Sequence, residues 1–216
     1  MKILYFDHPT EIRSAAILEE MFEITDVYFA ENTVVIFNGK VSLSPGIQFR
    51  GLCNVGDKVS IDMGSVLSNV SIGSGTNIRC HSILNDCSFG RNNIVGPHCF
   101  VRDKTFVGDG CIVGSHVELT RSKLGADVKI SHQAFVGDAV LGDRVIIGAG
   151  VVFCNYDGSD RQSSEVGMDT LVGSASLILS PINIGARVVI GAGSIVTKNI
   201  EDDEQFLQLR SRQIDG

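Results

Sequence analysis

Five histidines occur among the 216 residues, and four of them lie within a regular aliphatic pattern. His132 stands in the stretch ISHQAFVGD, between Ile130 and Val136. Imidazole changes its charge near neutral pH, so His132 can take a proton from a substrate, whereas a solvated surface position is the simpler interpretation of any single histidine. The surrounding sequence has to distinguish these two roles.

Three further histidines follow the same pattern. His81, His98 and His116 each come three residues after an aliphatic position, at nearly equal intervals along the chain. This spacing would stack them in a row, and neutral imidazole is a zinc ligand. The row lacks closely spaced histidine pairs, however, and the six cysteines form no C-x-x-C pair. The sequence therefore favours a solvated edge, reduced thiols and no metal site.

The composition excludes several classes of partner. The chain is rich in glycine (24 residues), poor in proline (4) and acidic, with a net charge of −7. An acidic protein has no general attraction for a nucleic-acid backbone or an anionic membrane. The first apolar stretch, Ile3 to Phe6, is too short for a secretory signal, and no segment approaches the length of a membrane span. We expect a cytoplasmic protein with no nucleic-acid or membrane partner.

The main organising feature is a repeat. Aliphatic or phenylalanine residues recur at every fifth or sixth position from Val55 to Phe153 and again from Val166 to Val196. Neither a helix nor an alternating strand has this spacing. Many of these positions precede glycine, as in VGDK, IGSG and VGDG, and a small side chain follows four residues after them. The pattern predicts a parallel β-helix whose triangular coils each contain three repeat units, with aliphatic side chains stacked inside.

Two cysteines and the chain ends fit this scheme. Cys99 and Cys111 fall on the small inward position, where a thiol acts as a small apolar group. Residues 1–40 are predicted to form a small α/β cap, because Thr10 is a candidate N-cap before an apolar spacing typical of an amphipathic helix. Residues 41–200 then form the β-helix domain, and residues 201–216 a polar C-terminal tail.

The largest break in the repeat follows Phe153, because the next aliphatic position, Val166, comes thirteen residues later. The intervening CNYDGSDRQSSE predicts a loop that projects from one corner. A loop at a corner leaves the stack of coils intact, so it can be either a functional element or a solvated excursion.

The stretches ISHQAFVGDAVLGDRVIIGAGVVFCNYDGSDR and VGMDTLVGSASLILSPINIGARVVIGAGSIVTKNI carry a family resemblance. They resemble the acetyltransferase half of the bifunctional bacterial N-acetylglucosamine-1-phosphate uridyltransferase and glucosamine-1-phosphate acetyltransferase, within the hexapeptide-repeat acyltransferase superfamily. The similarity runs from about residue 35 to about residue 212. It implies an all-β fold, a left-handed parallel β-helix, and only the resemblance indicates the hand. The uridyltransferase half has no counterpart, which implies a free-standing relative.

The resemblance also implies an activity. Members of this family transfer an acetyl group from acetyl-CoA to the amine of glucosamine-1-phosphate, in homotrimers whose sites lie between subunits. His132 matches the histidine that acts as general base toward the sugar amine. Glu118 matches a glutamate that supports the histidine, and a neighbouring carboxylate would orient the ring and favour the imidazolium.

The acceptor side matches the family unevenly. Arg102 matches an arginine that contacts the sugar phosphate, Asn155 an asparagine near the sugar, and Arg161 replaces a lysine with its charge retained. The departures are Thr120 in place of a phosphate-binding lysine, Phe135 in place of a tyrosine, and Ile146 in place of an asparagine. The lost cation, hydroxyl and amide weaken the expected binding of glucosamine-1-phosphate.

One residue is a candidate replacement for the missing cation. Arg121 follows Thr120 directly, but adjacent residues on a strand point to opposite faces, so we expect Arg121 to point away from the acceptor.

The donor side matches more closely. The residues that match acetyl-CoA contacts are Ala149, Tyr156, Ser174, Ala192 and, if the tail contains one inserted residue, Arg210. Small side chains would let the pantetheine arm lie against the corners of the coils.

Three alternatives stay open. One is a zinc enzyme built on the histidine row, as in the β-helical carbonic anhydrases. Another is a structural or donor-binding trimer that has lost catalysis. The last is an acetyltransferase whose acceptor is another amino sugar, a sugar nucleotide or a hydroxyl.

Overall fold

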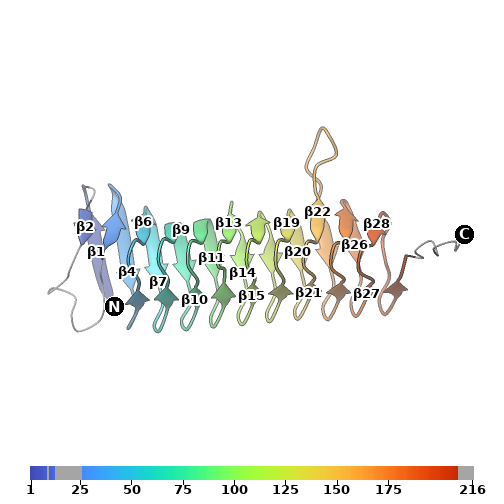
Figure 1. The fold of residues 1–216 in the computed structure, drawn as a ribbon, viewed down its shortest axis with the longest axis horizontal. Helices are drawn as coiled ribbons and strands as arrows, with labels where there is room; N and C mark the ends of the chain where they lie inside the picture. The colour runs from blue at the N-terminus through green and yellow to red at the C-terminus, as the bar shows by residue number, and fades with distance from the viewer. Residues whose placement is uncertain (9, 13–25, 209–216) are drawn as a thin grey trace, which may run out of the picture.

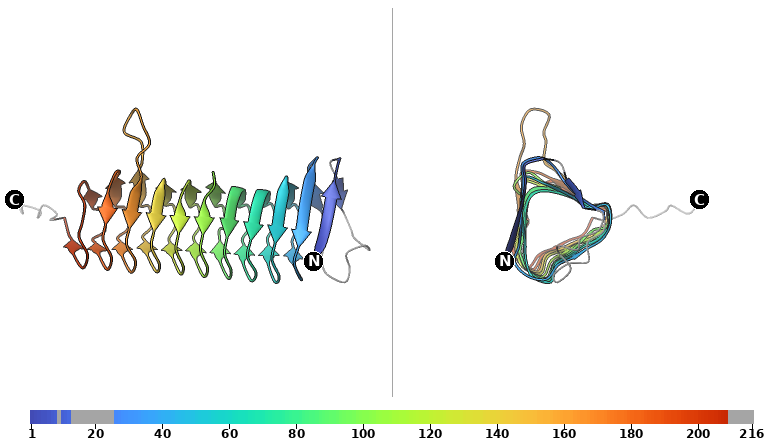
Figure 2. Two further views of the ribbon diagram at one scale, coloured as in Figure 1. Left: turned by 180° about the vertical axis from the view of Figure 1, so that it is seen from behind. Right: turned by 90° about the vertical axis from the view of Figure 1, so that its left-hand side faces the viewer.

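The computed structural model describes residues 1–8, 10–12 and 26–208, and every regular element in these ranges is a strand. The strands wind into a single parallel β-helix, which is a long rod in side view and a triangle when viewed along its axis (Figures 1 and 2). The prediction of an all-β parallel β-helix is confirmed. No described helix has the length and apolar composition that crossing a membrane requires.

Each coil contributes one short strand to each of three faces, which the chain visits in a fixed order. The first face contains β4 (Thr33–Phe37), β7 (Leu52–Val55), β14 (Phe106–Val107), β17 (Lys123–Leu124), β20 (Ala139–Leu141), β23 (Ser164–Val166) and β26 (Asn183–Ile184). The second face contains β5 (Ser42–Leu43), β8 (Ser60–Ile61), β10 (Asn77–Ile78), β12 (Ile94–Val95), β15 (Ile112–Val113), β18 (Lys129–Ile130), β21 (Ile146–Ile147), β24 (Leu171–Val172), β27 (Val189–Ile190) and β29 (Gln205–Phe206). The third face contains β3 (Val27–Phe29), β6 (Gln48–Arg50), β13 (Phe100–Arg102), β16 (Glu118–Thr120), β19 (Phe135–Gly137), β22 (Val152–Cys154), β25 (Leu177–Leu179) and β28 (Ile195–Val196). Two longer strands, β9 (Val66–Ile72) and β11 (Ile83–Phe89), cross from the third face to the first.

The pairing register gives the length of a coil. Leu67 pairs with Leu84, Leu84 with Val101, and Val101 with Leu119, so one coil corresponds to three repeat units as predicted. Backbone N–H groups in one coil donate to carbonyls in the next, which satisfies the polar groups of strands only two or three residues long. Each residue therefore stands above its equivalent in the preceding coil.

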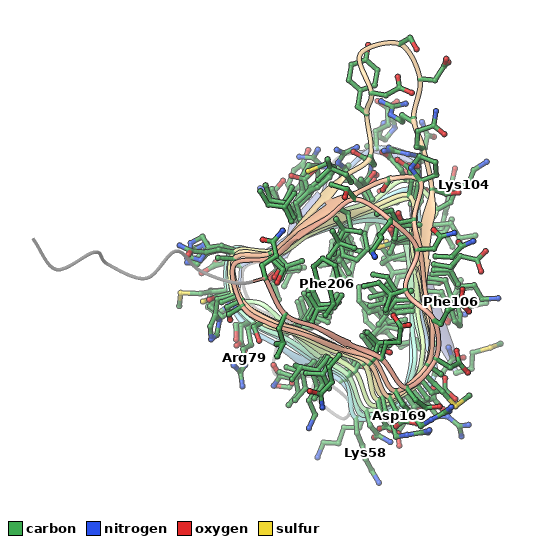
Figure 3. All side chains as sticks on the ribbon, turned by 90° about the vertical axis from the view of Figure 1, so that its right-hand side faces the viewer. Lys58, Arg79, Lys104, Phe106, Asp169 and Phe206 are labelled. Atoms are coloured by element: carbon green, nitrogen blue, oxygen red, sulfur yellow. The ribbon has the colours of Figure 1, made fainter. Side chains whose placement is uncertain are left out.

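The aliphatic positions of the repeat form the core. All 24 positions from Val55 to Val196 are buried, and the small residues Cys99 and Cys111 lie inward beside them. Figure 3 shows these side chains filling the triangle, with Phe206 inside it and Lys58, Arg79 and Asp169 pointing outward. Because each layer of side chains is covered by the layers above and below, a coil buries its apolar surface only as part of the stack.

The N-terminal prediction needs correction. Thr10 does not begin a helix, because Thr10–Ile12 forms strand β2, which pairs antiparallel with β3. Similarly, β1 (Lys2–Phe6) pairs antiparallel with β4. Both strands extend sheets that already exist at the open end of the rod, which satisfies their backbone groups without a helix. The rest of the predicted helix lies outside the described residues.

Parallel pairing extends past both predicted domain boundaries. Within residues 1–40, β3 and β4 already pair in parallel with β6 and β7, so the coils start there. At the other end, β29 adds to β27, and Phe206 packs against the core. The division into cap, β-helix and tail stays a prediction.

The loop that follows β22 projects from the rod, as the break in the repeat predicts (Figure 1). It is held by its own contacts: Tyr156 pairs with Arg161 across its base, and Asp157 accepts backbone N–H groups of Ser159 and Asp160 at 2.9 and 2.8 Å. These N–H groups stabilise the carboxylate and hold the pKa of Asp157 well below its usual range.

We predict that Leu119→Ala, in the centre of the stack, lowers the free energy of unfolding by about 2–5 kcal/mol, because it leaves a cavity between coils. Lys123→Ala, on the outer surface of the neighbouring strand, should change it by less than about 0.5 kcal/mol. Urea unfolding followed by circular dichroism measures both values. Equal losses in the two variants would contradict the stacked core.

Candidate active site

The corner between the second and third faces, here called the histidine corner, brings His132 and three predicted donor residues into one column. The backbone carbonyl of His132 accepts from Gly150 N–H at 2.9 Å, that of Ala149 from Ala175 at 2.8 Å, and that of Ser174 from Gly193 at 2.7 Å. His132, Ala149, Ser174 and Ala192 therefore occupy equivalent positions in successive coils. They are all solvent-accessible, which a site for a substrate requires.

His132 has a hydrogen-bond partner that the sequence analysis missed. Ser115, at the equivalent position one coil earlier, places its hydroxyl 2.9 Å from His132 Nδ1. When Nδ1 carries the proton and donates to Ser115, Nε2 keeps a lone pair for a substrate. The signal in the sequence is the separation of the two residues along the chain, which equals one coil.

Glu118 lies on β16 but does not bind His132. Its carboxylate accepts from Arg102 Nη2 at 2.7 Å, and the hydrogen-bond partner of His132 is Ser115. The predicted histidine–glutamate contact is thus not formed within one chain among the residues that the structure describes. The role of Glu118 in supporting His132 stays a prediction.

The corner between the third and first faces, here called the loop corner, gathers a network of charges. Arg102 binds Asp103 as well as Glu118, and Arg121 Nη1 donates to Asp103 at 3.1 Å. Arg121 also donates to both oxygens of Asp138, from Nε at 2.6 Å and from Nη2 at 2.9 Å. Asp103 and Asp138 are further functional candidates that the sequence analysis missed, because they come together only when the coils stack.

The position of Arg121 corrects the expectation from strand alternation. Strand β16 ends at Thr120, and Arg121 has φ = 48°, so the chain is already turning at the corner. Its guanidinium therefore reaches the same carboxylate, Asp103, that Arg102 binds. Thr120 is buried and donates its hydroxyl to Asp103 at 2.9 Å, so the departure from lysine is accommodated within the network.

The base of the projecting loop joins the same network. Asn155 Nδ2 donates to Asp138 Oδ2 at 2.5 Å. This contact depends on Gly137, since a Cβ there would lie 2.6 Å from Asn155 Nδ2 and 2.8 Å from the Phe135 ring. Arg161, on the other strand of the loop, contributes a positive charge that acts on Asp138.

Both aspartates are held as carboxylates. The hydrogen bond from Thr120 is the main reason that the pKa of Asp103 lies below its ordinary value, and the charges of Arg102 and Arg121 add to it. Partial burial of Asp138 opposes ionisation, but the hydrogen bonds from Arg121 and Asn155 outweigh it and lower the pKa of Asp138. The loop corner is therefore a fixed arrangement of ions at neutral pH.

The remaining predicted residues are distributed over the surface. Phe135 is half-buried on the third face, between the two corners, and Tyr156 is exposed on the projecting loop. Ile146 is exposed on the second face and does not join Thr120 and Phe135 within one chain. Arg210 lies outside the described residues.

The other histidines do stack as their spacing indicates. The rings of His81 and His98 lie 5.3 Å apart with an interplanar angle of 13°, and those of His98 and His116 lie 5.0 Å apart at 23°. Rings stacked face to face direct their nitrogens side by side, not toward a common centre. Within the described ranges, no group of three or more metal-ligating side chains is placed to hold an ion.

The inward cysteines are unsuited to nucleophilic chemistry. Burial raises the pKa of Cys87 to about 12 and the pKa of Cys99 and Cys111 to about 11, so the thiolate form is suppressed at neutral pH. All six cysteines are free thiols.

Comparison with known proteins agrees with this architecture. A family model described as the hexapeptide repeat of succinyl-transferase matches residues 165–198. The bifunctional protein GlmU of Synechococcus sp. (strain CC9605) is 39% identical over 166 residues, covering 77% of this chain and 37% of the relative. GlmU of Aromatoleum aromaticum is 36% identical over 174 residues, covering 81% of this chain and 38% of the relative. The chain thus spans less than two fifths of the length of these relatives.

Solved structures show the same fold. LpxA from Acinetobacter baumannii has a TM-score of 0.57 at 18% identity, and UDP-N-acetylglucosamine acyltransferase from Campylobacter jejuni has a TM-score of 0.56 at 16% identity. Each alignment covers 77% of this chain and 64% of the other. The repeat, the triangular coils and these structures define a left-handed hexapeptide β-helix. The chain is a homologue of part of GlmU and carries the hexapeptide repeat that the family model describes.

We predict that the loop corner makes the protein acid-sensitive. Since the pKa values of Asp103 and Asp138 are lowered in the folded state, their contribution to stability is complete above the ordinary aspartate pKa of about 3.9 and is lost as the pH falls below it. Asp138→Asn should lower the melting temperature at pH 7. Between pH 5 and pH 3, the melting temperature of this variant should then fall less than that of the wild type. Thermal unfolding across this range measures the effect, with the exposed Glu31→Gln as control. Parallel curves for wild type and Asp138→Asn would contradict it.

Proposed function

We propose that the protein is an acetyl-CoA-dependent N-acetyltransferase acting on an amino sugar or amino-sugar phosphate, with His132 as general base. The observation that carries this proposal is the column at the histidine corner, which aligns His132 with Ala149, Ser174 and Ala192 in successive coils. A base and a surface suited to the acyl donor thus lie on one edge. Homology to part of GlmU, and the acyltransferase name of a solved structure with the same fold, support the same class of reaction.

The chemical step requires one proton acceptor. The amine nitrogen attacks the thioester carbonyl carbon, a C–N bond forms, and the C–S bond breaks. His132 Nε2 takes the proton that leaves the amine, and the coenzyme A sulfur leaves and becomes protonated. Ser115 holds the ring through Nδ1, and in the tautomer in which Nδ1 donates to the hydroxyl, Nε2 has the lone pair that acts as base.

The donor fits the edge that follows His132. Ala149, Ser174 and Ala192 have small side chains, and a Cβ at Gly150 would meet nothing within 4 Å, so the corner is open beside Ala149. A pantetheine arm can lie against such a corner and bind through backbone groups. Tyr156 on the projecting loop is exposed and available to a donor held between chains.

We also propose a homotrimer, because two of the three faces are apolar. The second face exposes Ile112, Ile146, Leu171 and Val189, and the third exposes Ile83, Phe100 and Ile195. The first face carries polar residues between its few apolar ones, such as Asn54, Ser71, Ser88, Lys123 and Glu165. A cyclic trimer would join the second face of one subunit to the third face of its neighbour and leave the first face to solvent.

We predict that His132→Ala lowers kcat for acetyl transfer by about 10²–10⁴-fold and leaves acetyl-CoA binding within about twofold, because it removes the base without filling the donor column. Thiol release measures turnover with a panel of amino sugars, and calorimetry measures donor affinity. His116→Ala, at the same corner one coil earlier, is the matched control and should keep full turnover. Full turnover by His132→Ala would refute the assignment.

We predict that the wild type sediments at about three times the 23.2 kDa mass of one chain. Ile112→Glu on the second face should give smaller species, since it places a charge in the proposed interface. Val140→Glu, an exposed apolar residue on the first face, should sediment as the wild type does. A monomeric wild type, or dissociation caused equally by both substitutions, would contradict the trimer.

A further inference from the structure

The contact between Ser115 and the proposed base follows from the register of the coils. Gln133 N–H donates to the carbonyl of Ser115 at 2.9 Å, and Gly150 N–H donates to that of His132 at 2.9 Å. Ser115 and His132 thus hold the same position in successive coils, and their side chains leave the corner one strand spacing apart. Ser115 Oγ lies 2.9 Å from His132 Nδ1 and has no second partner among the described residues.

The imidazole that follows Ser115 in the chain does not compete for this hydroxyl. His116 has φ = 57° and stacks its ring on that of His98, with 5.0 Å between the ring centres. It therefore continues the row of stacked rings, whereas Ser115 stands in the column of His132. That column has no carboxylate in the part of the chain that the structure describes. Its other members are Met63, Cys80, Pro97, Ala149, Ser174 and Ala192.

Glu118 is held by a different partner. It lies on β16, where its register partner in the coil of His132 is Phe135. Its carboxylate accepts from Arg102 Nη2 at 2.7 Å. To reach His132, this carboxylate would have to give up a charge-assisted hydrogen bond. The contacts within one chain therefore assign Glu118 to Arg102 and Ser115 to His132.

We propose, as a refinement of the acetyltransferase function proposed above, that Ser115 is the positioning residue of His132 and takes the place of a carboxylate as the partner of the base. His132 Nδ1–H donates to Ser115 Oγ, which leaves the lone pair of Nε2 for the acceptor amine. Ser115 forms no bond to the substrate. Because the hydroxyl carries no charge, it holds the ring without favouring the imidazolium as a carboxylate does.

The first test identifies the tautomer and requires no turnover. Two-bond nitrogen–proton spectra of the full chain with isotope-labelled histidine distinguish a proton on Nδ1 from one on Nε2, and His132→Ala identifies the signals of His132. We expect the neutral wild-type ring to carry its proton on Nδ1, and Ser115→Ala to raise the share of the Nε2–H form at least about twofold. A neutral wild-type ring with its proton on Nε2 would overturn the proposal, because Nδ1 would then accept from the hydroxyl.

The second test is kinetic and uses acetyl-CoA with the panel of amino sugars. Ser115→Ala should lower kcat about 3–10-fold, the effect of one hydrogen bond, and leave KM for acetyl-CoA within about twofold. Ser115→Thr keeps a hydroxyl and should restore kcat to within about twofold of the wild type. Ser71→Ala makes the same substitution on the first face and is the matched control, with no expected change in kcat.

The pH profile provides a readout that a merely structural role would not change. Ser115→Asp should move the acid limb of kcat/KM to higher pH by about 1 unit, because a carboxylate beside the ring favours the imidazolium. Glu118→Gln should leave the acid limb in place, since Glu118 binds Arg102. An acid limb that moves in Glu118→Gln and not in Ser115→Asp would assign the supporting role to Glu118 and overturn the proposal.

A double variant tests whether Ser115 acts through His132. Adding Ser115→Ala to His132→Ala should cause no further loss of kcat, because the two residues act as a unit. A further loss would contradict the positioning role. An acetyl group found on Ser115 by mass spectrometry would also contradict it, because the hydroxyl would then be a nucleophile.

The variants also separate this inference from the function on which it rests. Loss of turnover in His132→Ala together with full kcat in Ser115→Ala would refute the positioning role and leave His132 as the base. Full turnover in His132→Ala would refute His132 as the base. A wild-type proton on Nδ1 that Ser115→Ala displaces would still support the positioning contact in that case.

Discussion

The stacking of coils, each three repeat units long, is the constraint on which the rest of the structure depends. It places each aliphatic residue over its equivalent, and it satisfies the backbone of strands too short to be stable alone. The same register aligns surface residues. His132, Ala149, Ser174 and Ala192 come into one column because the corner positions, like the core positions, repeat from coil to coil.

The two corners flanking the third face differ in chemistry. The histidine corner has small or aromatic polar residues and an open edge, which suits a donor and a proton acceptor. The loop corner holds paired ions, and the base of the projecting loop is tied to them through Asn155 and Asp138. Phe135 lies on the strand between them, so an acceptor that spans the third face can reach both.

Much of the fold could be predicted because the repeat is a local property of the sequence. Every aliphatic or phenylalanine position of the repeat from Val55 to Val196 is buried, and the coil lengths agree. The helix predicted from Thr10 onward was wrong for residues 10–12, since pairing with an existing sheet outweighed local propensity. The orientation of Arg121 was also wrong, because strand alternation fails where the chain turns with a positive φ.

The sequence by itself determined the β-helix, the position of the projecting loop and the candidate residues on each side of the site. It could do so because spacing along the chain translates directly into coils and corners. Only the tertiary structure decided which side chains meet. Ser115 binds His132, Glu118 binds Arg102 and not His132, and Asp103 and Asp138 neutralise Arg121. These contacts join residues one coil apart, and their geometry depends on how each corner turns.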